Sequence, residues 1–142
     1  MQPRRGITLE TIALIVFAAS LVMPALVVED KPLFGGDTHA KILFGIHCLI
    51  YGWLVLPGWL ANPLLLTAAI LHKFRRHRLA IVFASLAVVS AAIGPLMMRQ
   101  FADMRLLYPH VGYVAWCASI VAVLAAAARA AWRGNCESLT PQ

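Results

Sequence analysis

Few side chains in this 142-residue chain are suited to chemistry, and most of them stand inside long apolar runs. His47 and His110 lie far apart in the sequence, yet both are expected in the outer half of a membrane bundle, at similar depth. Two imidazoles placed in this way could ligate the iron of a b-type haem. A lone histidine in an apolar segment more often hydrogen-bonds a backbone carbonyl, so neither haem nor another cofactor is predicted.

The acidic residues and the cysteines indicate a chemical activity no more clearly than the two histidines do. Glu10 stands near the start of the first apolar run. Small four-helix drug exporters couple protons to export through a deeper glutamate in their first helix, but the rest of this chain does not resemble them. Cys48, Cys117 and Cys136 are isolated, and no CxxC pair is present. Cys48 and Cys117 could pair at similar depth, although a buried cysteine usually acts as a small apolar side chain. No catalytic pair or metal cluster is visible, so an enzyme is not predicted.

Residues 45–66 hold the densest group of special side chains. The candidate ligand-binding or packing residues, one of them from outside this stretch, are His47, Trp53, Trp59, Asn62 and His110. Five prolines map to the outer half or its boundary, namely Pro24, Pro57, Pro63, Pro95 and Pro109. Broken helices line cavities in transporters, which suggests an outer vestibule with residues 57–63 at its floor. Prolines also mark ordinary helix ends, and that interpretation stays open.

The composition indicates a membrane protein. The chain is 61% hydrophobic and 13% charged, with a mean hydropathy of +0.79. Soluble domains are about 45–50% apolar and about 25% charged. The formal net charge is +6, but a nucleic-acid surface would need far more basic residues and an aqueous domain. We therefore expect the lipid bilayer as a partner and no nucleic acid.

The apolar runs predict an all-α membrane protein, a four-transmembrane-helix bundle with a broken or re-entrant second membrane segment. One span needs about 20 apolar residues. The predicted pieces are a first span over about 7–28, an outer or re-entrant helix over about 40–56, and spans over about 58–74, 79–98 and 110–132. A kink is expected at Pro24. Residues 29–40 are predicted to form a polar loop, the tail 133–142 to be disordered, and residues 1–142 to form one domain.

The second segment is too long for a plain span. Its apolar run from Ile42 to Leu71 would measure roughly 45 Å as one helix, against a hydrocarbon core of about 30 Å. Pro57-Gly58 is a strong helix breaker, and Asn62-Pro63 suits a helix start, with the asparagine as N-cap. The run is therefore either one steep, kinked helix or, as we favour, two pieces with the break in the outer half.

The basic residues orient the chain. With the N-terminus inside, eight of the twelve lysines and arginines fall on the inner side and four on the outer side, which agrees with the positive-inside rule. The densest cluster is the stretch 72–78, His-Lys-Phe-Arg-Arg-His-Arg. We interpret this cluster as a topology signal that also meets anionic lipid. The threading requires Ile42–Leu71 to cross once, which predicts four spans with both termini in the cytoplasm.

Small residues predict how the last two spans pack. They recur every three or four residues as Ala80, Ala84, Ala87, Ala91 and Gly94, and again as Ala115, Ala118, Ala122 and Ala125. Small residues let helices approach closely in lipid, so an antiparallel hairpin on these two seams is expected. The simpler explanation is that alanine is common in membrane helices. Aromatic residues fall toward the outer side as Trp53, Trp59, Tyr108, Tyr113 and Trp116, and toward the inner side as Trp132, as in an interfacial belt.

A short stretch resembles other proteins. Gly52-Trp53, followed by Trp59-Leu60-Ala61-Asn62-Pro63-Leu64-Leu65, is similar to a stretch in small, uncharacterised bacterial inner-membrane proteins. The resemblance implies a bacterial inner-membrane setting and no activity. We predict a non-enzymatic membrane interaction or assembly protein that associates with itself or with other membrane proteins. The alternative is a small-solute or drug transporter with its site at the broken helix around residues 57–63.

Overall fold

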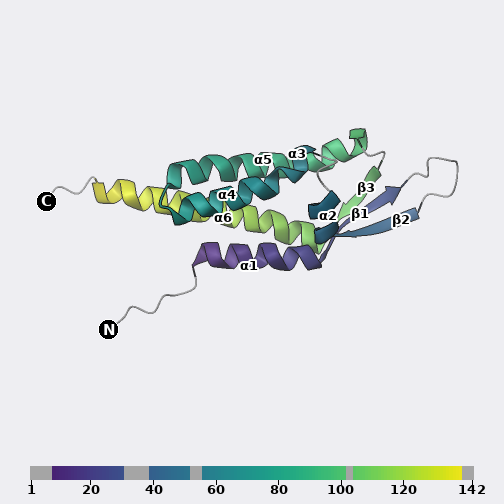
Figure 1. The fold of residues 1–142 in the computed structure, drawn as a ribbon, viewed down its shortest axis with the longest axis horizontal. Helices are drawn as coiled ribbons and strands as arrows, with labels where there is room; N and C mark the ends of the chain where they lie inside the picture. Colours follow the sequence, from purple (N-terminus) through teal and green to yellow (C-terminus); the bar gives the residue numbers. More distant parts are fainter. Residues whose placement is uncertain (1–7, 31–38, 52–55, 102–103, 139–142) are drawn as a thin grey trace.

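The computed structural model describes residues 8–30, 39–51, 56–101 and 104–138. They form an elongated bundle of helices that carries a small three-stranded sheet at one end (Figure 1). The elements in chain order are α1 (Leu9–Val22), β1 (Pro24–Asp30), β2 (His39–Phe44), α2 (Gly45–Tyr51), α3 (Leu56–Trp59), α4 (Ala61–Lys73), α5 (His77–Phe101), β3 (Met104–Pro109) and α6 (Val111–Ser138). The structure is mostly helical, but the predicted all-α class is wrong in one respect, because the chain also forms this sheet.

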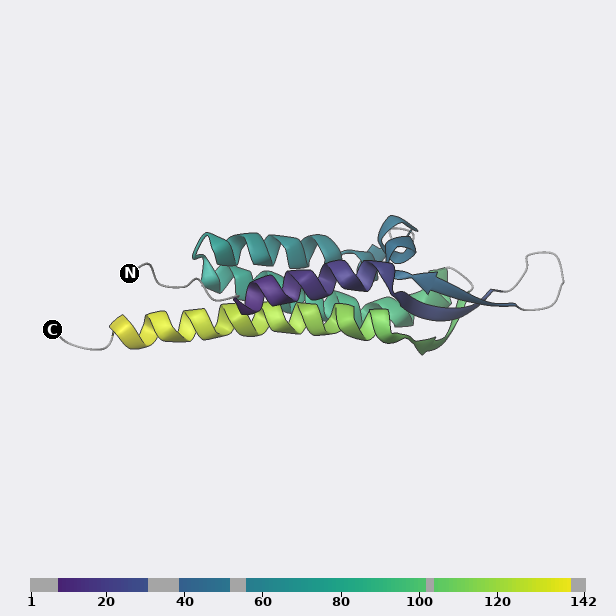
Figure 2. The same cartoon turned by 90° about the horizontal axis from the view of Figure 1, so that it is seen from below.

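The helices α1, α4, α5 and α6 run side by side (Figures 1 and 2). Helix α1 begins and α6 ends at the same end of the bundle, where the turn between α4 and α5 also lies, and the sheet occupies the opposite end. The first and last helices pack directly against each other. The core between the helices is built from small residues and a few branched ones, among them Ala61, Leu65, Ala84 and Ile120.

The prediction of one helix over 7–28 is wrong after Val22. Helix α1 ends at Val22, and Pro24 begins strand β1 instead of kinking a helix. Proline has no N–H to continue a helix, and Val27 and Val28 have the β-branched side chains that favour strands. Thr8 caps the start of α1, because its hydroxyl oxygen accepts a hydrogen bond from the Thr11 N–H at 3.2 Å.

Strand β1 is the centre of the sheet, which has the order β2-β1-β3 with both neighbours antiparallel. Four successive residues, Ala25 to Val28, are buried. Successive side chains of a strand point to opposite faces, so both faces of β1 are covered. Cys48 of α2 and Tyr113 of α6 pack against this cluster. Residues 29–30 and 39–40, which were expected in a polar loop, therefore belong to paired strands.

The second apolar segment is interrupted, but not in the predicted way. Residues 39–44 form a strand where a helix over 40–56 was expected, and the described helical residues of that range are Gly45–Tyr51 and Leu56. Helices α3 and α4 follow with only Leu60 between them. Pro57-Gly58 lies inside α3, and Asn62-Pro63 lies in the first turn of α4, whose N-cap position is Leu60. The expected N-cap role of Asn62 is therefore wrong.

Helices α5 and α6 confirm two of the predicted apolar helices. Their portions His77–Met97 and Val111–Gly134 are long and apolar enough to cross a membrane, while α1 is a shorter apolar helix. The seam predicted on α5 is buried at Ala80, Ala84, Ala87, Ala91 and Gly94. The seam predicted on α6 is wrong, because Ala118 is exposed while Ser119, Ile120 and Val123 are buried. Helix α6 also continues to Ser138, past the predicted end at Trp132.

Pro95 lies inside α5, and it leaves one backbone carbonyl of this helix without a hydrogen-bond donor. Because proline has no N–H, the carbonyl of Ala91, four residues earlier, has no partner within the helix. The Tyr113 hydroxyl of α6 donates to this carbonyl at 3.0 Å. A side chain of the neighbouring helix thus replaces the missing backbone bond and fixes α6 against α5 at this level.

We expect Tyr113→Phe to destabilise the protein by about 1–3 kcal/mol, because it leaves a buried carbonyl without a donor. In a Pro95→Ala background the backbone N–H of residue 95 can bond Ala91, so the same tyrosine change should cost clearly less there. Unfolding of the purified protein in detergent measures both losses, with Tyr108→Phe on the exposed face of β3 as the control. Equal losses in the two backgrounds would contradict this account.

Candidate functional site

The broken segment brings Asn62 into contact with the last helix. Asn62 is 9% exposed, and its side-chain oxygen accepts a hydrogen bond from the indole Nε1 of Trp116 at 2.9 Å. Helix α4 presents the amide from its first turn, and α6 supplies the indole. Buried polar groups need such partners. Trp116, which the sequence assigned to an aromatic belt, therefore holds α6 to α4.

Two further contacts fix the segment before Asn62. The Trp59 indole donates to the carbonyl of Leu49 at 2.8 Å, which satisfies one of the carbonyls left free at the end of α2. Gly58 of α3 meets Gly94 of α5 backbone to backbone. A Cβ added at Gly58 would lie 2.8 Å from the Gly94 Cα. Any larger residue at either position would push α3 away from α5.

The two histidines of the candidate site have different environments. His47 is exposed on α2, with its ring centroid 6.0 Å from that of Phe44. His110 precedes α6, and its N–H donates to the Ala25 carbonyl at 2.8 Å. Its buried Nδ1 has no hydrogen-bond partner in the described part of the chain. Since His47 is exposed while His110 is half-buried, the arrangement does not favour a haem held between the two imidazoles.

Of the five candidate residues, Asn62 and Trp59 take part in contacts that close the broken segment, while His47 and His110 belong to the sheet end of the molecule. Trp53 lies outside the described residues. Cys48 and Cys117 are both free thiols and form no disulfide with each other. Among the described residues, no group of three or more histidine, cysteine, aspartate or glutamate side chains is arranged to hold a metal ion.

Sequence reasoning missed a second polar cluster, at the opposite end of the bundle. The Nδ1 atoms of His72 and His77 are 3.1 Å apart, and the Nε2 of His72 lies 3.8 Å from a carboxylate oxygen of Glu10. The two histidines bracket the turn between α4 and α5, and Glu10 comes from the first turn of α1. The two histidines were visible in the stretch 72–78, which we interpreted as a topology signal that also meets anionic lipid.

Comparison with known proteins yields no relative: no family model, curated protein or solved structure matches the chain. The resemblance noted around Gly52-Trp53 and residues 59–65 therefore stays a prediction.

A double-mutant cycle on Asn62 and Trp116 tests the interhelical bond. Trp116→Phe should destabilise the protein because it leaves the buried Asn62 oxygen unpaired, and Asn62→Leu should remove that oxygen. We expect the double variant to lose about 0.6–2 kcal/mol less than the sum of the single losses, the usual range for a hydrogen bond between membrane helices. Unfolding in detergent gives the three values.

Ser119→Ala combined with Asn62→Leu provides the matched control for this cycle. The Ser119 hydroxyl bonds the Trp116 carbonyl within its own helix, so its loss should add to that of Asn62→Leu. Simple additivity in the Asn62 and Trp116 cycle would show that the two side chains do not stabilise each other.

Proposed function

We propose that this chain is a multi-pass protein of the bacterial inner membrane, with both termini in the cytoplasm, and that it is a non-enzymatic interaction or assembly protein. Three features support the proposal. They are the apolar surface of the helices, the basic charge at one end of the bundle and the strand edges at the other end. The strand edges are the observation that supports an interaction role, and the first two features support a position of the sheet at the outer face of the membrane.

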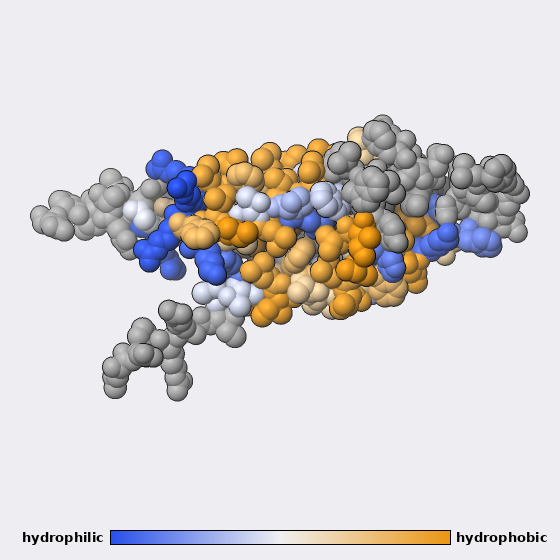
Figure 3. Space-filling model, in the orientation of Figure 1, coloured by the Kyte–Doolittle hydropathy of each residue, from blue (hydrophilic) through white to orange (hydrophobic). Residues whose placement is uncertain are grey.

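The helices expose apolar side chains along their length. On α5, Val82, Leu86 and Val89 are about half exposed and recur at the spacing of one helix face. The face shown in Figure 3 is mostly apolar along the middle of the molecule, apart from a band of hydrophilic residues, and is hydrophilic toward both ends. A water-soluble monomer rarely exposes apolar patches of this extent. In a bilayer the same side chains face lipid.

The basic residues support the orientation. At the end where α1 begins, the exposed basic residues among those described are Lys73, Arg75, Arg76, Arg78, Arg129 and Arg133. Segments rich in lysine and arginine stay on the cytoplasmic side of a membrane. The same threading puts the sheet at the outer face.

Helix α1 is too short to cross the bilayer without help. Its 14 residues span about 21 Å, while the hydrocarbon core is about 30 Å thick. About three residues of strand, at roughly 3.3 Å each, would complete the crossing. If α1 starts at the inner boundary, the beginning of β1 therefore lies in the outer leaflet, together with the residues that pair with it. Those partners are Leu43 and Phe44 of β2 and Pro109 of β3.

The edges of the sheet then need a partner. In the described part of the chain, β2 and β3 each pair with β1 on one side only. In hydrocarbon an unpaired N–H or C=O costs several kcal/mol, so a strand edge at this depth is covered by protein. Ile42 and Phe44, which are 58% and 41% exposed, supply apolar side chains along the β2 edge. An interaction or assembly protein would have a second chain on this edge, either another copy or a different membrane protein.

Photo-crosslinking in intact membranes tests this proposal. A photoreactive residue at Ile42 should give one discrete adduct with a protein, because the β2 edge is covered. The same residue at Val89 of α5, which is 54% exposed, should give lipid adducts only. Tagged and untagged copies expressed together show whether the adduct is a homo-oligomer. Absence of a protein adduct at Ile42, or an identical adduct at Val89, would contradict an edge partner.

The alternative from the sequence, a small-solute or drug transporter with its site around residues 57–63, makes a different prediction. Asn62→Ala and His47→Ala would then abolish a resistance or uptake phenotype that the wild-type chain confers. Asn62 contacts Trp116, and Gly58 contacts Gly94. Protein atoms therefore fill the space that a transported solute would need, which favours the interaction role. Transport that survives both substitutions would remove residues 57–63 as its site.

A further inference from the structure

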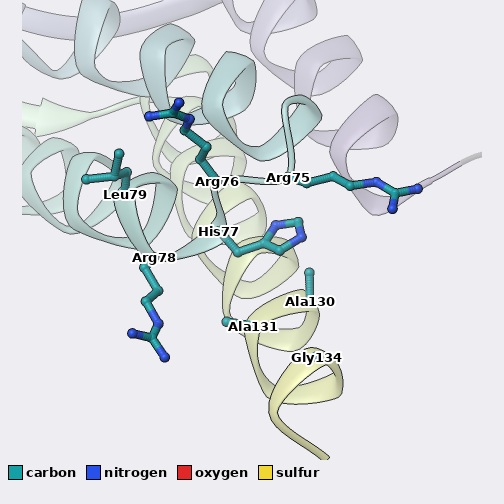
Figure 4. Close-up of a pocket in the computed structure, with 8 residues that line it drawn as sticks. All are labelled: Arg75, Arg76, His77, Arg78, Leu79, Ala130, Ala131 and Gly134. Carbon is teal, nitrogen blue, oxygen red and sulfur yellow. The ribbon is translucent and has the colours of Figure 1, made fainter. Parts of the chain in front are cut away.

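A hollow of about 480 Å³ opens between the α4–α5 turn and α6, at the inner end of the bundle in the threading proposed above. Its lining is Arg75, Arg76, His77, Arg78, Leu79, Ala130, Ala131 and Gly134. Figure 4 shows the His77 ring directed toward Ala130 across the hollow, while the three arginine side chains extend from the turn in different directions. The hollow thus has a basic side on the turn and an apolar side on α6.

The basic side carries positive charge that the described part of the chain does not neutralise. The guanidinium groups of Arg75, Arg76 and Arg78 make no hydrogen bond or ion pair within the described residues. They stand at the N-terminus of α5, where the helix dipole is itself positive and where acidic residues would be favourable. A set of cations at this end of a 25-residue helix is stabilised by an anion.

The carboxylate of Glu10, at the same end of the bundle, contacts a histidine and not the arginines. Glu10 of α1 lies 3.8 Å from the Nε2 of His72, and His72 in turn contacts His77 through their Nδ1 atoms. This chain of contacts holds the His77 ring beside the hollow. The turn itself is fixed by backbone bonds from the Arg75 and Arg76 N–H groups to the His72 and Leu71 carbonyls. Arg75 adopts a positive φ of 59°, unusual for a residue with a side chain.

The apolar side of the hollow matches the membrane boundary. Leu79 and the two alanines offer hydrocarbon next to the basic turn. Phe74 and Trp132, which are 72% and 75% exposed, stand at the same end, as aromatic residues do at the headgroup level. In Figure 3 the apolar surface gives way to the basic end in this region. A ligand that fits both sides has an anionic group attached to hydrocarbon.

We propose that this hollow binds the headgroup phosphate of an anionic phospholipid of the inner leaflet, with the guanidinium groups on the phosphate and the glycerol and first acyl carbons against Leu79, Ala130 and Ala131. Guanidinium groups bind phosphate oxygens in pairs of parallel hydrogen bonds. The exposed arginine side chains rotate to reach the phosphate, and the rigid turn and α6 fix where it lies. This site goes beyond the interaction function proposed for the opposite end.

The test separates one bound lipid from a diffuse attraction of lipid to the basic end. The full-length protein in detergent is titrated with phosphatidylglycerol, and bound lipids are counted by native mass spectrometry. Arg76→Gln with Arg78→Gln removes two charges from the hollow. Lys73→Gln with Arg129→Gln removes two charges from the same end, outside the lining. We expect the first pair to weaken binding of the first lipid about tenfold or more and the second pair about twofold to threefold, given about fivefold per basic residue in direct contact.

A second variant changes the shape of the hollow and leaves its charge unchanged. A Cβ added at Gly134 meets no atom within 4 Å, and leucine favours a helix more than glycine does. Gly134→Leu should therefore fold normally while narrowing the hollow, and should weaken phosphatidylglycerol binding several-fold. Gly134→Ala should bind as the wild type does.

Three results would overturn the proposal. Equal losses in the two charge pairs would mean that only the total charge attracts lipid. Wild-type binding by Gly134→Leu would mean that the lipid lies elsewhere. Displacement of the lipid by inorganic phosphate at comparable concentration would mean that the hollow binds a soluble anion. Phosphatidylcholine, which carries the same phosphate without net charge, should bind at least tenfold more weakly than phosphatidylglycerol.

Discussion

Backbone groups that lose their helical partners must find others, and the rest of this structure depends on that constraint. Helix α1 stops before Pro24, and the chain continues as the central strand of a sheet with a neighbour on each side. A central strand satisfies its N–H and C=O groups as completely as a helix does, so β1 can follow α1 directly. The sheet therefore lets the chain leave a short helix without exposing its backbone.

The same constraint explains the interhelical hydrogen bonds. Proline 95 frees the Ala91 carbonyl, and Tyr113 of α6 bonds it. The end of α2 leaves carbonyls free, and Trp59 bonds one of them. Asn62 finds its donor in Trp116. These aromatic side chains combine apolar bulk with one polar atom, which suits them to places where a helix ladder is interrupted inside an apolar bundle.

The sequence predicts the helices better than the sheet for a physical reason. The α5 seam is readable because small residues recur at helical spacing along one continuous element, and the structure buries it. Strands β1 and β2 are short apolar runs next to helical runs, and such runs look alike in either conformation. Their pairing with β3 depends on a segment much later in the chain. The Asn62–Trp116 bond joins residues 54 apart, and no local pattern fixes the rotation of the two helices.

The position of β1 between β2 and β3 also has a consequence for biogenesis. When the ribosome has made only the first half of the chain, β1 and β2 can already pair, but the other side of β1 stays open until β3 emerges after α5. Helix α1 likewise cannot pack against α6, its main helical neighbour, until α6 has been synthesised. The first half of the chain alone therefore leaves one side of β1 unpaired, and β3 and α6 complete the sheet and the bundle. The folded state of the first quarter of the chain therefore depends on the contacts that β1 and α1 make with the last quarter.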